Sequence, residues 1–379
     1  MKNTKLNLQA VLFMALLFDF NACRTDDPLD DEPSTEVPTE SSGEVKGFFL
    51  LNEGNMSMNK AALDYMDYET GVYDKEIFKT ANPEAVGGLG DVGNDMGIYG
   101  SKLYVVVNAS NKVEILDVNT HKRLKQIDID NGRYMTFYNG KAYLSTYLGA
   151  IGDPNAANGK VVEIDTTSLS ITRSVEVGRQ PEELVAYNDK IYVANSGGYS
   201  APNYESTVSV IDIDSFTETK RIEVAINLHR IQVDNEGDLY VSSRGDYFET
   251  ASKLFIVDTE TETVKKTFDL AVSNMTFYND MLYIFSTEFS YQTGENTISY
   301  NTLDTTTETV LEGSFIKDGN EALIKIPYGI NINPETKDIL ITDAKDYVTP
   351  GSLYCFSADG ILKWEVETGD IPNKVVFTY

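Results

Sequence analysis

Short runs in which apolar and polar residues alternate recur from about residue 46 to the end of the chain. The best-marked unit is an apolar strand, a tight turn and a second strand with Tyr near its start, as in "GIYGSKLYVVVN", "TFYNGKAYLSTY" and "VAYNDKIYVANS". Alternation with a period of two predicts half-buried β-strands. Asn-Gly and Asn-Asp between the strands predict hairpins, because these residues tolerate positive φ. No amphipathic helical pattern runs beyond about three turns, so the pattern predicts an all-β fold.

The paired strands belong to a longer repeat. A third strand follows after a loop of variable length and usually ends in Asp with Thr or Ser close behind, as in "KVEILDVNT" and "VSVIDIDS", and a fourth strand such as "TRSVEVG" comes next. The tyrosines that mark the second strands are Tyr104, Tyr143, Tyr192, Tyr240 and Tyr283. They recur about every 40 to 50 residues, which is the period of a four-stranded propeller blade.

The two ends of the repeat region complement each other. Residues 46–78 supply strands that match the second, third and fourth strands of a blade, whereas the terminal "NKVVFTY" matches a first strand with nothing after it. Open sheet edges invite aggregation, and a blade shared between the termini removes them. We therefore predict a seven-bladed β-propeller over residues 46–379, closed by sharing the first blade between N- and C-terminal strands.

The segment before the repeats has a different character. Residues 1–22 read as a signal peptide, because Lys2 and Lys5 precede an apolar run at 11–18 that is too short to span a bilayer. The run ends in "FNAC", which resembles a bacterial lipoprotein signal in which Cys23 becomes lipidated; an ordinary secretory signal cut nearby is the alternative. Residues 23–45 are acidic, rich in Pro, Ser and Thr, and nearly devoid of apolar residues, which predicts a disordered tether.

Charge and composition exclude several classes of function. The formal net charge is −28, from 31 Lys and Arg against 59 Asp and Glu, which argues against nucleic acid or an anionic membrane surface as a partner. The chain has 2 His and 2 Cys, so a zinc or copper site is not expected. No nucleophile–base–acid arrangement can be assembled from the sequence. We expect a protein that is not an enzyme, with no catalytic residues, no metal and no cofactor.

The topology of a four-stranded blade indicates where a ligand would bind. The connections between first and second and between third and fourth strands share one face of the disc, and here they are mostly short turns such as "YNGK" and "DTTS". The other connections share the opposite face and are long and varied, and long loops on a rigid scaffold often carry function. Aromatic, amide and guanidinium side chains there offer flat contacts and hydrogen bonds. The candidate ligand-binding residues on this long-loop face are Asn52, Asn55, Tyr147, Tyr199, Tyr204, Arg244, Tyr247, Phe248, Tyr291 and Tyr347, with Arg133, Tyr134 and Arg230 at the channel mouth.

Two stretches carry a resemblance to known families. The unit "YVANSGGYSAPNYESTVSVIDIDS" resembles the YVTN repeat of bacterial surface-layer, YncE-like and quinoprotein-like propellers. The span from "LNEGNMSMNKAALDYMD" onward is similar to the propeller lipoproteins of gut Bacteroidetes, which include BtuG-type proteins. Acid directly after Cys23 (Asp26 and Asp27) resembles the signal that sends lipoproteins of that phylum to the outside of the outer membrane.

The resemblance implies a lipid-anchored, cell-surface protein of the outer membrane. Such a protein would capture cobalamin (vitamin B12) or a related corrinoid and hand it to a TonB-dependent outer-membrane transporter. Two alternatives stay open. One is a glycan- or protein-binding subunit of another surface uptake system. The other is a propeller lyase or lactonase, which would need clustered His, Glu or metal ligands at the channel mouth.

Overall fold

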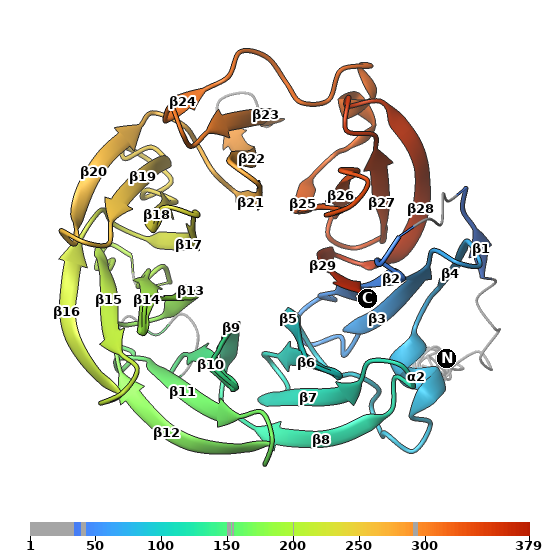
Figure 1. Ribbon diagram of the computed structural model, residues 1–379, viewed down its shortest axis with the longest axis horizontal. Helices are drawn as coiled ribbons and strands as arrows, with labels where there is room; N and C mark the ends of the chain where they lie inside the picture. The colour runs from blue at the N-terminus through green and yellow to red at the C-terminus, as the bar shows by residue number, and fades with distance from the viewer. Residues whose placement is uncertain (1–33, 39–42, 150–152, 154, 200, 291–294) are drawn as a thin grey trace, which may run out of the picture. The chain divides into compact units, whose positions relative to one another are not determined.

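A computed structural model describes residues 34–38, 43–149, 153, 155–199, 201–290 and 295–379. These residues form seven β-sheets placed around a ring, and each sheet is one blade (Figure 1). Helix is confined to short segments of the described chain, α2 (Ile77–Ala81) and the 3-10 turn η1 (Asn320–Leu323). The prediction of an all-β, seven-bladed β-propeller is confirmed.

Six blades are continuous in sequence, and each runs from an innermost first strand to an outermost fourth strand (Figure 1). Blade 2 contains β5 (Gly93–Tyr99), β6 (Lys102–Val107), β7 (Lys112–Asp117) and β8 (Arg123–Asp128). Blade 3 contains β9 (Gly132–Tyr138), β10 (Lys141–Thr146), β11 (Lys160–Asp165) and β12 (Ser170–Glu176). Blade 4 contains β13 (Pro181–Tyr187), β14 (Lys190–Asn195), β15 (Thr207–Asp212) and β16 (Thr217–Glu223).

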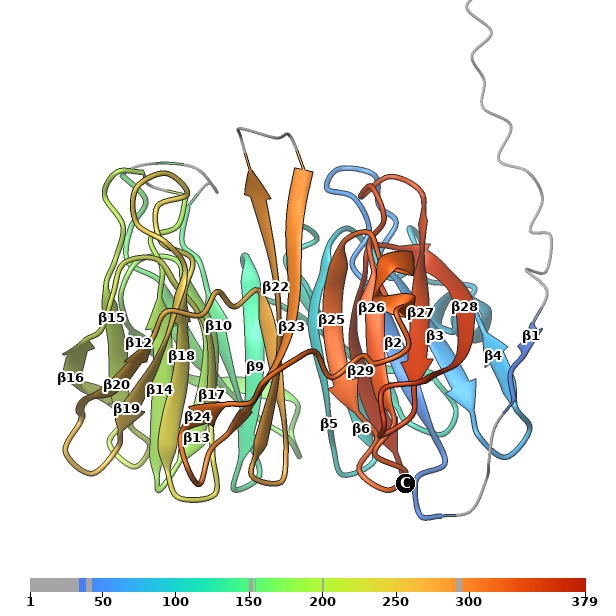
Figure 2. The same cartoon turned by 90° about the horizontal axis from the view of Figure 1, so that it is seen from above.

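The remaining continuous blades differ more from one another. Blade 5 contains β17 (Leu228–Val233), β18 (Asp238–Ser243), β19 (Lys253–Asp258) and β20 (Thr263–Phe268). Blade 6 contains β21 (Asn274–Tyr278), β22 (Met281–Ser290), β23 (Glu295–Asp304) and β24 (Thr309–Val310). Blade 7 contains β25 (Pro327–Ile332), β26 (Ile339–Asp343), β27 (Pro350–Phe356) and β28 (Leu362–Asp370). The long strands β22 and β23 rise above the neighbouring blades on the same side as the long loops (Figure 2).

Blade 1 joins the two ends of the propeller. Its strands β2 (Gly47–Asn52), β3 (Ala62–Asp67) and β4 (Val72–Asp74) come from the N-terminal side, and its innermost strand β29 (Pro372–Thr378) comes from the C-terminus. β2 and β29 pair antiparallel, from Gly47 opposite Thr378 to Leu51 opposite Lys374. The predicted sharing of the first blade is therefore confirmed.

The structure adds a strand that the sequence did not suggest. β1 (Thr35–Glu36) pairs antiparallel with β4 and extends blade 1 on its outer edge. Val37, directly after it, is buried in the same core cluster as Trp364. These residues lie inside the segment assigned to the tether at 23–45, so part of that segment packs on the propeller. The signal peptide at 1–22 and Cys23 lie outside the described residues.

The repeated tyrosines hold neighbouring blades together. Tyr104 and Tyr240 are fully buried, and each ring meets the edge of a phenylalanine from the first strand of the next blade. The ring centroids of Tyr104 and Phe137 lie 5.2 Å apart, and those of Tyr240 and Phe277 lie 5.4 Å apart. Such edge-to-face pairs add to the burial of apolar area. The repeat that marks the blades in the sequence is thus also the contact that joins them.

Candidate binding site at the channel mouth

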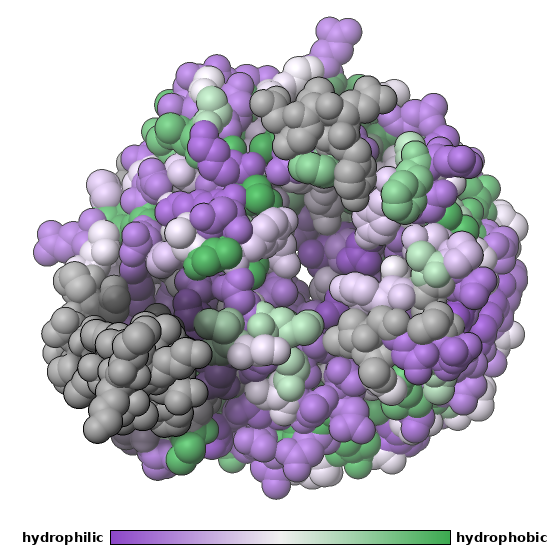
Figure 3. Space-filling view, turned by 180° about the vertical axis from the view of Figure 1, so that it is seen from behind, coloured by the Kyte–Doolittle hydropathy of each residue, from purple (hydrophilic) through white to green (hydrophobic). Residues whose placement is uncertain are grey.

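A cavity of about 880 Å³ opens at the centre of the ring on the long-loop face. Figure 3 shows this face hollowed at its centre, with apolar and polar patches around the hollow. Residues from all seven blades line the cavity. They include eight of the candidates from the sequence, namely Arg133, Tyr134, Tyr199, Arg230, Arg244, Tyr247, Phe248 and Tyr347.

The rim of the cavity is aromatic. Phe248 is 83% exposed and Tyr247 is 55% exposed, and Tyr199 and Tyr347 are also exposed. Exposed aromatic side chains gathered around one opening are a common feature of binding surfaces. The rim can therefore give flat apolar contact together with hydroxyl groups.

Two similar loops present two of the rim tyrosines. The backbone of Tyr247 has φ of 64° and that of Tyr347 has φ of 63°, a region that side-chain-bearing residues rarely adopt. Each follows an aspartate whose Oδ1 accepts hydrogen bonds from later backbone N–H groups of the loop. Asp246 accepts from Phe248 at 2.9 Å, and Asp346 accepts from Thr349 at 2.8 Å. The Asp-Tyr order in both loops thus fixes a strained backbone that turns the tyrosine toward the mouth.

The channel wall is built from the start of each first strand. A three-residue motif marks the start of each first strand, such as "GRY" at residues 132–134 of blade 3. We call the second residues of the seven motifs the mouth ring, and the third residues the inner ring. The mouth ring is Asn94, Arg133, Glu182, His229, Ser273, Tyr328 and Asn373. The inner ring is Asp95, Tyr134, Glu183, Arg230, Asn274, Gly329 and Lys374. All of the mouth ring except Glu182 lines the cavity, and all of the inner ring except Gly329 lines a smaller cavity of about 70 Å³ beyond it.

A repeated β-bulge lets both rings face the channel. The pairing register between first and second strands shifts at this point in six of the seven blades. In blade 3, Arg133 and Tyr134 both lie opposite Ser145. The Ser145 hydroxyl accepts a hydrogen bond from the Tyr134 backbone N–H at 3.1 Å and donates one to the Glu182 carbonyl at 2.7 Å. Bulges commonly re-aim side chains next to functional sites.

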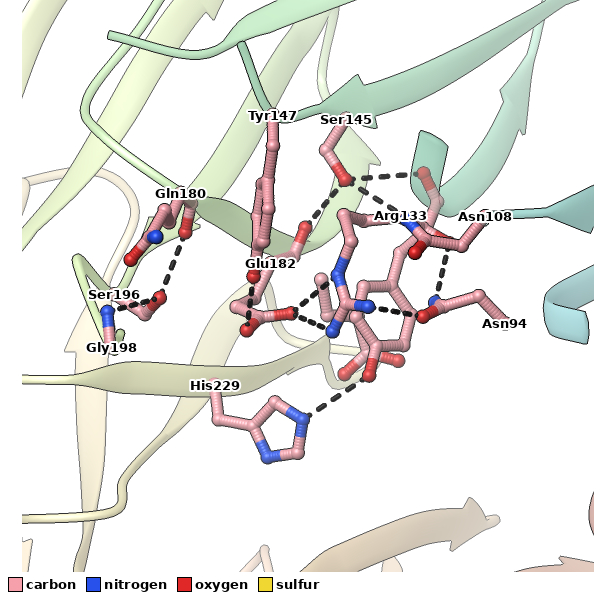
Figure 4. A network of polar contacts seen from close by, with 12 residues as sticks. Asn94, Asn108, Arg133, Ser145, Tyr147, Gln180, Glu182, Ser196, Gly198 and His229 are labelled. Carbon is pink, nitrogen blue, oxygen red and sulfur yellow. Dashed lines mark hydrogen bonds and ion pairs between the residues drawn. The ribbon is translucent and has the colours of Figure 1, made fainter. Parts of the chain in front are cut away.

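Glu182 is the centre of a polar network in the wall (Figure 4). Its carboxylate is fully buried and accepts hydrogen bonds from Arg133 Nη2 at 2.9 Å, from Arg244 Nη1 at 3.2 Å and from the Tyr147 hydroxyl at 2.7 Å. Burial alone would raise the pKa of this carboxyl, but the charges of Arg133 and Arg244 outweigh it and hold the pKa at about 2. Glu182 is therefore ionised at neutral pH and fixes both arginines.

Tyr134 connects two arginines with a buried histidine. The guanidinium carbons of Arg133 and Arg230 lie 5.5 Å and 5.1 Å from its ring centroid, within the range of cation–π attraction. Its hydroxyl is hydrogen-bonded to Nε2 of His229 at 3.2 Å (Figure 4). Burial, followed by the charges of Arg244, Arg230 and Arg133, holds the pKa of His229 well below its usual value. His229 is therefore neutral at pH 7 and acts here as a hydrogen-bonding group.

A second carboxyl group lies across the mouth. The hydroxyl of Tyr328 donates to Glu53 Oε2 at 2.7 Å. Burial raises the pKa of Glu53, although this hydrogen bond and the charges of Arg133 and Arg230 oppose the shift. The channel mouth thus combines three guanidinium groups, a neutral imidazole, amides and a carboxyl with reduced acidity, which suits binding of a polar organic molecule by hydrogen bonds.

Two candidates are buried behind the cavity wall and do not line it. Asn52 is fully buried at the end of β2, where its Nδ2 donates to Asp64 at 2.7 Å. Asn108 has the same place at the end of the second strand of blade 2, and its amide donates to the Gly132 carbonyl at 2.8 Å. Asn52, at the end of the second strand of blade 1, therefore has a structural role. Tyr147 is also buried, and it reaches the site only through its hydrogen bond to Glu182.

The other three candidates have different outcomes. The amide of Asn55 donates to the Tyr347 carbonyl, which ties the loop of blade 1 to that of blade 7. Tyr204 is half-buried in the long loop of blade 4 and is not part of the cavity wall. Tyr291 lies outside the described residues.

Sequence reasoning missed several polar groups of the wall, above all Glu53, Asn94, Glu182 and Tyr328. Three of these belong to the mouth ring. An alignment of the seven first strands places "GND", "GRY", "PEE", "LHR", "VSN", "PYG" and "PNK" in register. This alignment, combined with Ser or Thr in the facing second strands, is the signal that could have found them.

The described residues include no group of three or more His, Cys, Asp or Glu side chains placed to hold a metal ion. No helix among them is long and apolar enough to cross a membrane.

The ring of blades and the cavity at its mouth define the chain as a seven-bladed β-propeller with a candidate ligand site on the long-loop face. Residues 46–371 match the family described as a domain of unknown function (DUF5074). The chain belongs to this family. No curated protein matches the chain.

Solved structures show the same fold at low identity. A hypothetical selenium-binding protein from Sulfolobus tokodaii is 10% identical, with a TM-score of 0.63 over 89% of this chain and 94% of that one. A quinonprotein alcohol dehydrogenase-like protein from Bacteroides thetaiotaomicron is 14% identical, with a TM-score of 0.57 over 89% and 79%. Hydrazine synthase from Kuenenia stuttgartiensis is 14% identical, with a TM-score of 0.56 over 70% and 77%. At these identities the likeness concerns the fold alone.

Proposed function

We propose that the protein captures a large, flat, polar organic ligand at the channel mouth, with cobalamin or a related corrinoid as the leading candidate. The observation that carries this proposal is the cavity of about 880 Å³, with an aromatic rim and a polar wall. A corrinoid is a broad plate fringed with amide groups. Tyr247 and Phe248 would contact its face, and the asparagines and arginines of the wall would bond its fringe.

The proposal includes a place in the cell. In this view Cys23 carries lipid, the protein faces outward from the outer membrane, and the ligand passes to a TonB-dependent transporter. The sequence "FNAC" and the acidic residues after it support this part of the proposal. It is tested by metabolic labelling with palmitate. Label should be lost in Cys23→Ala, and unchanged labelling of that variant would contradict lipidation.

A glycan is the second candidate ligand. Phe248 and Tyr247 are adjacent and strongly exposed, and exposed aromatic rings can pack against the apolar faces of sugar rings. The polar wall would bond hydroxyl groups as well as amides. This alternative makes the protein a binding subunit of a different surface uptake system.

Calorimetry of the purified full-length protein with cobalamin, cobinamide and a panel of glycans separates the two. We expect saturable binding of corrinoids. Tyr247→Ala should weaken it by about thirtyfold or 2 kcal/mol, as for a central aromatic contact. Lys141→Ala is the matched control, because Lys141 lies on the short-turn face and pairs with Asp165. If only a glycan binds, the glycan replaces the corrinoid as the proposed ligand. If Tyr247→Ala and Lys141→Ala weaken binding equally, the proposed location of the site is wrong.

A further inference from the structure

We propose that the channel contains an anion-binding position at Arg230, where a carboxylate or phosphate group of the bound ligand docks. The inference deepens the proposed function and rests on it for the identity of the whole ligand. It concerns one corner of the site, at the boundary between the mouth ring and the inner ring. It predicts that anionic ligands are preferred, although the chain as a whole carries a net charge of −28.

The guanidinium of Arg230 lacks the partners that a buried cation normally has. Among the described residues none accepts a hydrogen bond from it, and its Nε is buried without a partner. Its ion pair with Glu183 spans 4.0 Å from Nη1 to Oε1, beyond hydrogen-bond distance, and its side chain is only 12% exposed. Buried charges are costly unless they are paired and hydrogen-bonded. A ligand oxyanion would supply the missing acceptors.

The neighbouring arginines show the contrast. Arg133 and Arg244 both bind the carboxylate of Glu182, so each already has an acceptor of full negative charge. One carboxylate thus serves two guanidinium groups at hydrogen-bond distance, whereas the carboxylate paired with Arg230, that of Glu183, stays 4.0 Å from its Nη1. His229, whose pKa is lowered by burial and then by the three arginines, adds no positive charge of its own. In the described part of the chain, Arg230 is therefore the arginine of the three whose guanidinium still lacks a hydrogen-bond acceptor.

The other charged groups that face the channel have partners of their own. Lys374 pairs with Asp95. Glu53 accepts a hydrogen bond from Tyr328, and Glu183 accepts one from the Ile231 backbone N–H at 2.9 Å. Burial raises the pKa values of both glutamates above their usual range.

There is space for a small oxyanion next to Arg230. Arg230 and Tyr134 border both the main cavity and the smaller one of about 70 Å³. That volume corresponds to roughly two water molecules, which is comparable to a carboxylate or phosphate head group. A ligand across the mouth could thus insert such a group while its body stays among the rim aromatics. Bidentate pairing with a guanidinium would fix its orientation.

Small aromatic probes test the position without a corrinoid. Binding of phenyl phosphate, benzoate and phenol to the full-length protein is measured by ligand-observed NMR titration. We expect phenyl phosphate, benzoate or both to bind at least tenfold more tightly than phenol, and the stronger of the two identifies the preferred group. The preference should weaken with added salt. Arg230→Gln should abolish it, and Lys141→Gln should leave it unchanged.

Arg230→Lys guards against a folding defect in Arg230→Gln. This variant keeps the charge but loses the planar fork, so the preference should fall severalfold while the melting temperature stays near that of the wild type. Equal binding of phenol and both anions by the wild type overturns the inference, as does an undiminished preference in a folded Arg230 variant. Corrinoid calorimetry is a separate readout. A preference for anions without corrinoid binding would refute the proposed ligand and support the anion-binding position. Corrinoid binding without a preference for anions would support the proposed ligand and refute the anion-binding position.

Discussion

Glu182 shows how one residue can organise a cavity without lining it. It is buried, ionised and bonded to two arginines and a tyrosine that would otherwise move independently. Removal of one partner from a buried ion pair leaves an uncompensated charge, which is strongly destabilising. The residue therefore links stability to the geometry of the cavity.

The acid stability of the protein should depend on Glu182. Its pKa is lowered from about 4.5 to about 2 in the folded state, so its contribution is present above pH 4.5 and is lost as pH falls toward 2. By linkage this contribution is roughly 3 kcal/mol. Glu182→Gln should lower the stability at pH 7 and flatten its fall between pH 4.5 and 2. Urea unfolding at several pH values measures both effects, and an unchanged pH profile in the variant would count against the network.

Tyr147 and Tyr247 should behave differently, although the sequence suggests the same role for both. Tyr147→Phe removes a hydroxyl that donates to a buried carboxylate, so we expect a loss of about 1–3 kcal/mol in stability. Tyr247→Phe alters an exposed side chain and should leave stability within about 0.5 kcal/mol. Thermal melts of the two matched variants make the comparison. A larger loss for Tyr247→Phe would mean that the hydrogen bond from Tyr147 to Glu182 contributes little to stability.

At the scale of elements, the bulge at the start of the first strand in six blades links blade packing to the channel. In blade 7 the Thr342 hydroxyl accepts a hydrogen bond from the Gly329 N–H at 2.7 Å and donates one to the Pro372 carbonyl of blade 1 at 2.6 Å. This is the arrangement that Ser145 makes between blades 3 and 4. One hydroxyl thus stabilises the bulge of its own blade and holds the next.

Thr342→Val should therefore lower the free energy of unfolding by more than the small change in side-chain size suggests. The side chain keeps its shape, but a buried N–H and a buried carbonyl lose their partner, at a cost of about 1–3 kcal/mol for each group left unsatisfied. Thr263→Val on the exposed outer strand β20 is the control and should change little. Denaturant unfolding of both variants measures the difference. Similar small effects would show that the hydroxyl is dispensable to the bulge.

The strands and blades could be predicted because their signals are local. Alternation, hairpin residues and a repeated tyrosine each occupy a few neighbouring positions. The wall of the cavity is different, because Arg133, Glu182 and Arg244 meet from separate blades. Asn52 is a residue that the sequence wrongly assigned to the site. It precedes a long loop in the sequence, but the strand includes it and its amide is used for packing.

At the scale of the whole molecule, the ring depends on the shared blade. β29 supplies the inner edge of blade 1 and packs against blades 2 and 7 as well. Its Val375 is buried in the cluster that contains Cys355 and Trp364 of blade 7. A closed ring distributes such contacts around its whole circumference, and β29 is the segment where they can be broken by a terminal truncation.

Deletion of residues 373–379 should open the ring. The loss of most of one strand's backbone pairing and its apolar burial should cost several kcal/mol, a large part of the stability of a domain. Deletion of residues 34–36 is the control, since β1 has only two paired residues at the outer edge, and it should cost far less. Calorimetric melting of both truncations gives the comparison. An unchanged melting temperature after loss of β29 would contradict its role in closure.

The shared blade also sets the order of events during synthesis. Gly47 emerges from the ribosome early, but its partner Thr378 is synthesised only after the other six blades. Strands β2 to β4 must therefore wait with an open inner edge until β29 has been synthesised. Such non-local pairing is slow, since the entropy of closing a long loop is lost before any contact forms. Closure of the ring therefore comes after synthesis of all seven blades, and a chain that still lacks β29 cannot close it.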